Sequence, residues 1–127
     1  MSKSDTSAHI QIKRVYEEPL TEDGYRILID RIWPRGVSKE QAAIDEWMKE
    51  ITPSSELRKW FGHRPEFFEA FAEKYVRELE QKPRCWLLAD RICEMAIDRT
   101  VTLVYAAKDP VHNHANVLQN WLKSRPM

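Results

Sequence analysis

The sequence has only three glycines, two cysteines and no long hydrophobic run. So few glycines leave no glycine-rich phosphate-binding loop, and the Gly-x-Ser-x-Gly turn of serine hydrolases is also missing. Because no stretch of about 18 apolar residues occurs, we expect no membrane-spanning segment. Residues 1–8 are polar and lack the apolar stretch of a secretory signal, so the cytoplasm is the expected location.

The two cysteines, Cys85 and Cys93, lie in a segment that we expect to be helical. Their spacing would separate them by about 12 Å along a helix, which is too far for a disulfide. The sequence also lacks a four-ligand zinc pattern. We therefore expect two reduced and mostly buried thiols, and neither a metal ion nor another cofactor.

The charges balance, with 20 basic and 20 acidic residues and a formal net charge of +0. This balance argues against a general attraction to nucleic acid or to an anionic membrane. Hydrophobic residues make up 43% and charged residues 31% of the 127 residues, which is typical of one folded domain. We expect a disordered tail over residues 1–8 and a single α/β domain over residues 9–127.

The patterns of apolar residues predict three strands. Residues 9–15 alternate between apolar and polar side chains, which indicates a strand near the edge of a sheet. Residues 25–32 contain a continuous apolar run, and residues 101–107 are apolar almost throughout. Continuous apolar runs are typical of strands that are covered on both faces.

Helices are predicted between these strands and after the last one. An apolar stripe at helical spacing indicates the clearest helix over residues 65–80. A second helix is predicted over residues 84–97, and Asn113 can cap the N-terminus of a final helix.

The middle of the chain is harder to interpret. Ser38 and Gln41 resemble a capping box, which predicts that a short helix starts there. Residues 43–51 fit either a helix or a poorly formed strand. Thr52 is the expected cap of a further helix, which Gly62 can end.

Strands that alternate with helices predict an α/β fold, with a small parallel or mixed sheet flanked by helices. In such sheets, ligands bind beyond the carboxyl ends of the strands. Two polar loops, residues 30–36 and 108–114, directly follow the two apolar strands. We therefore expect the loops to meet and to form a site at this edge of the sheet.

The first loop combines an acid, two guanidinium groups and an indole within residues 30–36. Asp30 can orient Arg31 or Arg35, and an arginine can bind a phosphate or carboxylate through two parallel hydrogen bonds. Trp33 offers a flat face to a ring or a cation. The alternative is a structural role, in which Asp30 simply pairs with an arginine and Trp33 covers the core.

The second loop, residues 108–114, follows a buried strand and opens a helix, whose free backbone N–H groups attract anions. Lys108 and Asn113 are the residues that we expect to hold an anion there. His112 and His114 are not four residues apart and have no cysteine or glutamate beside them, so we expect no metal site. Helix-capping or solvent-exposed histidines are the simpler interpretation.

A third polar position is His63, which lies between the end of one predicted helix and the start of the next. It can join the site if this turn folds over the edge of the sheet. An ordinary turn between helices, with packed aromatic side chains, is the alternative.

Three segments of the sequence resemble one protein family. They are residues 25–36, 60–63 and 104–109, and the first contains the specific motif Asp-Arg-x-Trp-Pro-Arg-Gly. The sequence thus resembles the domain of unknown function 488 (DUF488) family, of the YeaO-like kind, from about His9 to about Trp121. The family has no established activity, so the resemblance implies no particular reaction.

The resemblance implies that the two polar loops are signature segments of the family. It therefore favours functional roles for Asp30, Arg31, Trp33 and Arg35. Arg64 departs from the family pattern, which often has a helix-capping aspartate here, so no shared role is implied for it. Such proteins are sometimes labelled transcriptional regulators, but the sequence shows no helix-turn-helix pattern with a basic recognition helix.

The main hypothesis is a pocket at the edge of the sheet that binds a small phosphate- or carboxylate-bearing molecule, with acid–base catalysis left open. The candidate ligand-binding residues are Arg31, Trp33, Arg35, Tyr105, Lys108 and Asn113, and the candidate acids or bases are Asp30, His63 and Asp109. In this hypothesis the cationic groups hold the anion, and Trp33 or Tyr105 stacks on the ligand.

Two alternatives from other classes stay open. A nucleic-acid-binding or regulatory module would use the basic residues Arg31, Arg35, Lys39, Arg58, Lys59 and Arg64, although the neutral net charge argues against it. An adaptor or structural protein would use its five tryptophans at an interface. The sequence leaves the ligand, the reaction and the oligomeric state undetermined.

Overall fold

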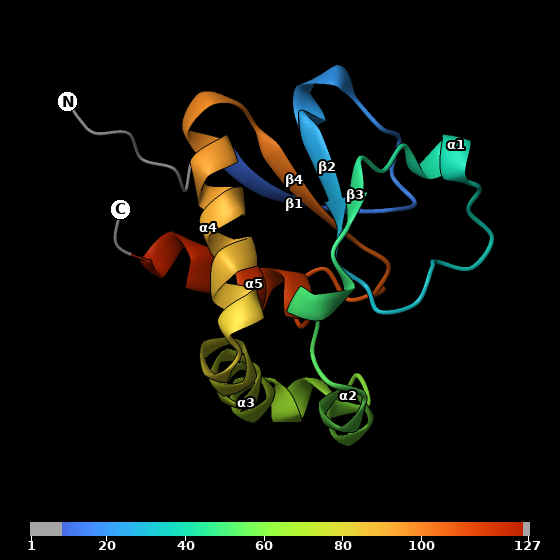
Figure 1. Ribbon diagram of the computed structural model, residues 1–127. Helices are drawn as coiled ribbons and strands as arrows, with labels where there is room; N and C mark the ends of the chain where they lie inside the picture. The colour runs from blue at the N-terminus through green and yellow to red at the C-terminus, as the bar shows by residue number, and fades with distance from the viewer. Residues whose placement is uncertain (1–8, 126–127) are drawn as a thin grey trace.

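The computed structural model describes residues 9–125, so the tail predicted for residues 1–8 lies outside the described part. Within it, four parallel strands form one sheet in the order β1-β4-β2-β3. The strands are β1 (Ile10–Arg14), β2 (Tyr25–Leu28), β3 (Glu46–Trp47) and β4 (Val101–Tyr105). The predicted α/β class is confirmed, and the sheet is parallel rather than mixed (Figure 1).

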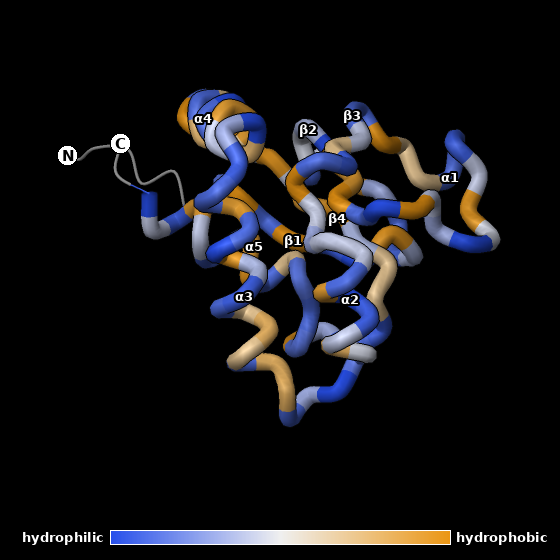
Figure 2. The backbone as a smooth tube through the Cα atoms, turned by 60° about the horizontal axis from the view of Figure 1, so that its bottom comes forward, coloured by the Kyte–Doolittle hydropathy of each residue, from blue (hydrophilic) through white to orange (hydrophobic). Residues whose placement is uncertain are grey.

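The helices cover the two faces of the sheet unequally. They are α1 (Lys39–Ala42), α2 (Ser55–Phe61), α3 (Phe68–Gln81), α4 (Pro83–Asp98) and α5 (His114–Ser124), with short 3₁₀ turns over Thr21–Asp23, Lys49–Ile51 and Pro65–Phe67. The longer helices α3, α4 and α5 lie on one side of the sheet and α1 lies on the other (Figure 1). Hydrophobic and hydrophilic segments alternate along the long helices, so each has one apolar side (Figure 2).

Successive side chains of the central strands β2 and β4 point to opposite faces of the sheet, so the protein has two hydrophobic cores. Ile27 of β2 and Leu103 of β4 belong to the main core under the long helices. Their neighbours Leu28 and Val104 belong to a smaller core on the opposite face, under the segment that contains α1. All four side chains have an exposed fraction of 0%. This two-sided burial explains the continuous apolar runs of β2 and β4.

All three predicted strands are shorter in the structure than expected, and β2 differs the most. β1 is an edge strand, as predicted, but β2 ends at Leu28 instead of continuing to residue 32. The Ile29 N–H still donates to the Val104 carbonyl at 2.9 Å. The next residue, Asp30, pairs with Ala106 N through its side-chain carboxylate instead of its backbone. Residues 43–51 contain the two-residue strand β3 and a 3₁₀ turn, because Ala43 has a left-handed φ of 50° that ends α1.

Local capping signals are mostly confirmed. Ser38 and Gln41 form the expected capping box of α1. Gly62 ends α2 with a φ of 55°, and Asn113 caps α5 by accepting a hydrogen bond from Asn116 N at 2.9 Å.

The cap predicted at Thr52 is wrong. Ser54 caps α2 instead, since its hydroxyl accepts a hydrogen bond from Leu57 N at 3.1 Å. The Thr52 hydroxyl donates to the Lys49 carbonyl at 2.6 Å, which closes the preceding 3₁₀ turn. The chain thus makes one more turn before α2 than the sequence pattern indicated.

A buried polar network lies on the face of the sheet that α1 covers. The Arg26 guanidinium donates to the Asp23 carboxylate at 2.6 Å and to the Ala42 carbonyl at 2.7 Å. Thr102 of β4 donates to the Asp23 carbonyl at 2.6 Å, and Lys13 of β1 pairs with the Asp23 carboxylate at 3.1 Å. The network joins three strands to the end of α1, and it was not predicted from the sequence.

The two thiols are free and buried, as expected. Burial raises the pKa of both Cys85 and Cys93 above the ordinary thiol value. None of the helices within residues 9–125 has the length and hydrophobicity needed to span a bilayer.

Candidate functional site

The two polar loops meet at the carboxyl edge of the sheet, as predicted. β2 and β4 are parallel neighbours, so the loops that follow them leave the sheet side by side. Asp30 Oδ2 accepts a hydrogen bond from Ala106 N at 3.0 Å. His114 Nε2 donates to the Ile29 carbonyl at 2.7 Å. These bonds tie the loop after β2 to the loop after β4 and to the start of α5.

The two connections leave the ends of β2 and β4 toward opposite faces of the sheet. The chain leaves β4 toward α5, which packs with α3 on one face of the sheet (Figure 1). It leaves β2 toward α1, which lies on the opposite face. In open parallel sheets, the point where neighbouring connections turn to opposite faces is the usual place for a ligand.

Asp30 does not pair with an arginine as the sequence suggested. Its Oδ1 atom lies 3.1 Å from His114 Nε2, although the N–H of that ring points to the Ile29 carbonyl. Among residues 9–125, Oδ1 therefore receives no hydrogen bond. The backbone carbonyl of Asp30 accepts a hydrogen bond from Trp47 Nε1 at 2.6 Å. These contacts make Asp30 the residue that joins the two loops.

Tyr105 lies below the loops and is 4% exposed. Its ring meets His114 edge to face, with 6.5 Å between the ring centroids. Burial raises the pKa of the Tyr105 hydroxyl above its ordinary value. A ring that is covered in this way supports His114 and does not offer a free face for stacking.

Asp109 shapes the second loop. Its carboxylate accepts hydrogen bonds from His112 N at 3.0 Å, from Val111 N at 2.9 Å and from His112 Nδ1 at 2.9 Å. The bond from His112 N has the largest effect among the contacts that lower the Asp109 pKa to about 2. Asn113 is buried, caps α5 and donates to the Asp109 carbonyl at 2.7 Å. Both residues thus hold the loop in shape.

Three segments at this edge each carry a cationic residue: Arg14, Arg35 and Lys108. Arg35 and Lys108 were predicted and are exposed. Arg14, at the end of β1, was missed, and its Nε donates to the Ala107 carbonyl at 2.9 Å. The Arg14 guanidinium lies 4.7 Å from the ring centroid of Tyr16, whose hydroxyl donates to the Arg35 carbonyl at 2.9 Å. Only the pairing of β1 with β4 could have revealed Arg14.

The other two residues of the first loop point elsewhere. Arg31 is half-buried, and its Nε lies 3.4 Å from the Pro53 carbonyl, at the long limit for a hydrogen bond. Trp33 Nε1 donates to the Val37 carbonyl at 2.7 Å. The Trp33 ring contacts Trp47 edge to face, with centroids 5.5 Å apart.

His63 lies on the exposed turn after α2, with a φ of 58°. Its ring centroid is 6.3 Å from that of Phe61, which packs against Phe68. Phe68 in turn contacts His112 of the second loop at 5.3 Å. His63 is thus connected to the second loop through a series of ring contacts. Within residues 9–125, no hydrogen bond or ion pair joins His63 to Asp109.

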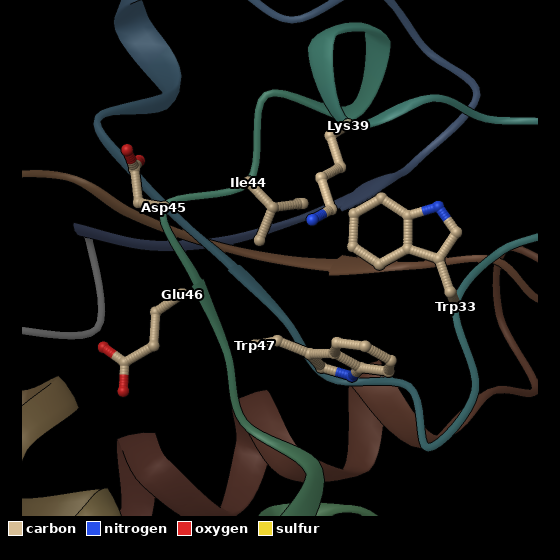
Figure 3. A pocket seen from close by; sticks show the side chains of 6 residues that line it. All are labelled: Trp33, Lys39, Ile44, Asp45, Glu46 and Trp47. Atoms are coloured by element: carbon tan, nitrogen blue, oxygen red, sulfur yellow. The ribbon is translucent and has the colours of Figure 1, made fainter.

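A pocket of about 200 Å³ opens beside the first loop, at the β3 edge of the sheet (Figure 3). It is lined by Trp33, Lys39, Ile44, Asp45, Glu46 and Trp47. Trp33 was predicted as a site residue, and Lys39 was predicted only as part of a possible nucleic-acid surface. Across residues 9–125, no group of three metal-ligating His, Cys, Asp or Glu side chains comes together.

Comparisons with known proteins identify close relatives. The family model described as the inactive DUF488-N3 subclade matches residues 9–126. The chain is 47% identical over 116 residues to the uncharacterized protein YeaO of Escherichia coli (strain K12), which covers 91% of this chain and 98% of the relative. An uncharacterized protein of Mycobacterium tuberculosis (strain ATCC 25618 / H37Rv) is 38% identical over 116 residues, which cover 91% of this chain and 95% of the relative. No solved structure gives a significant match.

Proposed function

Because the chain belongs to the DUF488 family, in a subclade described as inactive, we propose that it binds a small anionic molecule without transforming it. The ligand is a phosphate- or carboxylate-bearing molecule held at the carboxyl edge of the sheet. The observation that supports this proposal is that three segments bearing a cation are held together where β1, β2 and β4 end. The Arg14 side chain donates to the Ala107 carbonyl next to Lys108, and Tyr16, which contacts Arg14, donates to the Arg35 carbonyl.

The charge at this edge supports an anionic ligand. Within the described part of the chain, Arg14, Arg35 and Lys108 form no ion pair with a carboxylate. The nearby Asp109 carboxylate is already held by three donors of its own loop. Guanidinium groups bind phosphates and carboxylates through paired hydrogen bonds, and a lysine adds a point charge.

The hydrogen bonds and positions of the candidate acids and bases support binding without catalysis. A general acid or base must reach the reacting atom of its substrate. Asp30 is held between Ala106 N and His114, and Asp109 is held by the backbone of its own turn. His63 is exposed, and within residues 9–125 it forms no hydrogen bond or ion pair with either carboxylate. The description of the subclade as inactive agrees with this arrangement.

The test is the thermal stability of the full chain in the presence of phenyl phosphate, acetate and inorganic phosphate. A ligand at about ten times its Kd stabilises by about 1.4 kcal/mol, which raises the Tm by roughly 5 °C for a domain of this size. We expect a rise with at least one of these anions. Arg35→Glu and Lys108→Glu should each abolish it.

Arg77→Glu is the matched control, because Arg77 is an exposed arginine on α3, away from the proposed site. This variant should keep the full rise in Tm. An equal loss of the rise in all three variants would indicate a nonspecific charge effect, and its persistence in Arg35→Glu and Lys108→Glu would refute the proposed site.

A further inference from the structure

The pocket beside β3 is separate from the cationic edge described above. It lies on the last strand in the order β1-β4-β2-β3, whereas Arg14 and Lys108 lie at the ends of β1 and β4. Arg35 belongs to the same loop as Trp33 but is not among the residues that line the pocket. Its lining comes from the first loop, α1, the segment after α1 and β3 (Figure 3). An inference about this pocket therefore does not rest on the proposed function.

Two indole rings form fixed walls of the pocket. Trp33 Nε1 donates to the Val37 carbonyl at 2.7 Å, and Trp47 Nε1 donates to the Asp30 carbonyl at 2.6 Å. The rings meet at an interplanar angle of 68°. Because both indole N–H groups are engaged with the backbone, they hold the rings in place, and the walls offer apolar ring surface. Ile44 adds aliphatic surface to the lining, to one side of the Trp33 ring (Figure 3).

The two carboxylates that line the pocket have partners inside the protein. Glu46 accepts two hydrogen bonds from Arg91, at 2.8 and 3.0 Å, and one from the Tyr25 hydroxyl at 2.8 Å. Asp45 Oδ2 accepts a hydrogen bond from Arg26 N at 2.8 Å. These bonds direct the carboxylates toward the protein, so they are poorly placed to attract a positively charged ligand.

Lys39 is the charged residue of the lining whose side chain has no hydrogen-bond or ion-pair partner within residues 9–125. Lys39, in the first turn of α1, is exposed and places its ammonium group beside the indoles (Figure 3). Among residues 9–125, it forms no ion pair. Lys49 Nζ already occupies a face of the Trp47 ring, 4.1 Å from its centroid. A cationic ligand would therefore meet two ammonium groups.

We propose that this pocket binds a planar aromatic group that carries one negative charge, of which an aromatic carboxylate is the simplest case. The ring packs against Trp33 and Trp47, and the carboxylate pairs with Lys39. The volume of about 200 Å³ is smaller than the roughly 300–1,000 Å³ of sites for drug-sized molecules. The pocket therefore suits a single-ring molecule.

The experiment follows the tryptophan indole N–H signals of the full chain by ¹H–¹⁵N NMR, since each of the five tryptophans gives one signal. Benzoate is compared with benzamide, which has the same shape without the charge, and with tetramethylammonium. Benzoate should shift the signals of Trp33 and Trp47 and leave those of Trp60, Trp86 and Trp121 in place. Because an exposed ion pair contributes little, benzamide should bind about two- to fivefold more weakly.

Lys39→Gln should make benzoate bind as weakly as benzamide, whereas Lys59→Gln, an exposed lysine on α2, should retain the difference. The Lys39 side chain makes no hydrogen bond in the described part of the chain, so this variant keeps the cap of α1. Lys108→Glu should leave benzoate binding at the two tryptophans unchanged, which distinguishes this pocket from the cationic edge.

Three results would overturn the proposal. They are an absence of shifts at Trp33 and Trp47, equal affinity for benzoate and benzamide, and tighter binding of tetramethylammonium than of benzoate. Unchanged benzoate affinity in Lys39→Gln would also exclude Lys39 as the partner of the carboxylate.

Discussion

The carboxylate of Asp30 and the backbone N–H of Ala106 are joined by a hydrogen bond of 3.0 Å. This bond continues the pairing of β2 with β4 after the strands themselves have ended. It holds the first loop against the second through a side chain that is 15% exposed. Together with the bond from His114 to the Ile29 carbonyl, this carboxylate fixes how the two loops lie at the candidate site.

We predict that Asp30→Ala destabilises the fold by about 1–3 kcal/mol, because Ala106 N loses its hydrogen-bond acceptor. Asp30→Asn should cost less, since an amide oxygen can still accept this bond. The free energies of unfolding of the two variants, measured in urea, test the difference. Equal stability of Asp30→Ala and the wild type would show that the bond is dispensable.

The second prediction concerns the buried pair of Arg26 and Asp23. Arg26→Met should destabilise by about 3 kcal/mol or more, because it removes the guanidinium that faces a buried carboxylate. The double variant Arg26→Met with Asp23→Leu should recover part of this loss. Denaturation of both variants provides the comparison, and a double variant less stable than Arg26→Met would contradict the expected coupling.

The third prediction is a pH dependence of the second loop. The hydrogen bonds from His112 N and Val111 N hold the pKa of Asp109 at about 2, below the value of 3.8 for an ordinary aspartate. A lowered pKa in the folded state means that the ionised form stabilises the fold above pH 4. This contribution disappears as the pH falls from about 4 through about 2.

Asp109→Asn should therefore lower stability at neutral pH, and its difference from the wild type should shrink as the pH approaches 2. A ¹³C NMR titration of the Asp109 carboxyl checks the cause directly. An Asp109 midpoint near the ordinary value would show that these bonds do not form in solution.

The fourth prediction concerns the thiols. Cys85 and Cys93 are buried, and burial raises the pKa of each above its ordinary value, so little thiolate forms at neutral pH. A thiol reagent should label the native protein at least about tenfold more slowly than the unfolded protein. The release of a coloured thiol from the reagent, followed with and without denaturant, measures both rates. Equally fast labelling of the native chain would contradict this burial.

The parts of the fold that were predicted correctly depend on local signals. The apolar runs of β2 and β4 identified the buried strands, because side chains on both faces are covered. Asn113 and Ser38 identified the starts of α5 and α1, since a cap acts on its own first turn. β3 was left ambiguous because two half-buried residues carry too short a pattern to identify a strand.

The sequence did not predict which residues far apart in the chain contact each other. Asp30 was expected to pair with an arginine of its own loop, but its Oδ1 atom lies 3.1 Å from His114 Nε2, and only the fold brings these residues close. Arg14 reaches the site because β1 pairs with β4 across most of the chain. Trp47 joins Trp33 because β3 lies beside β2. Each of these contacts depends on strand order, which the sequence patterns did not specify.

The unequal cover of the sheet has a consequence for how the molecule opens. One face lies under α3, α4 and α5, while the other is closed by α1 and a loop that the Arg26 contacts fasten to the sheet. We therefore expect residues 33–45 to open before the larger core does, a partial unfolding that amide hydrogen exchange detects. A molecule bound between Trp33 and Trp47 would slow this exchange. The amide exchange rates of residues 33–45 would therefore report whether the pocket is occupied.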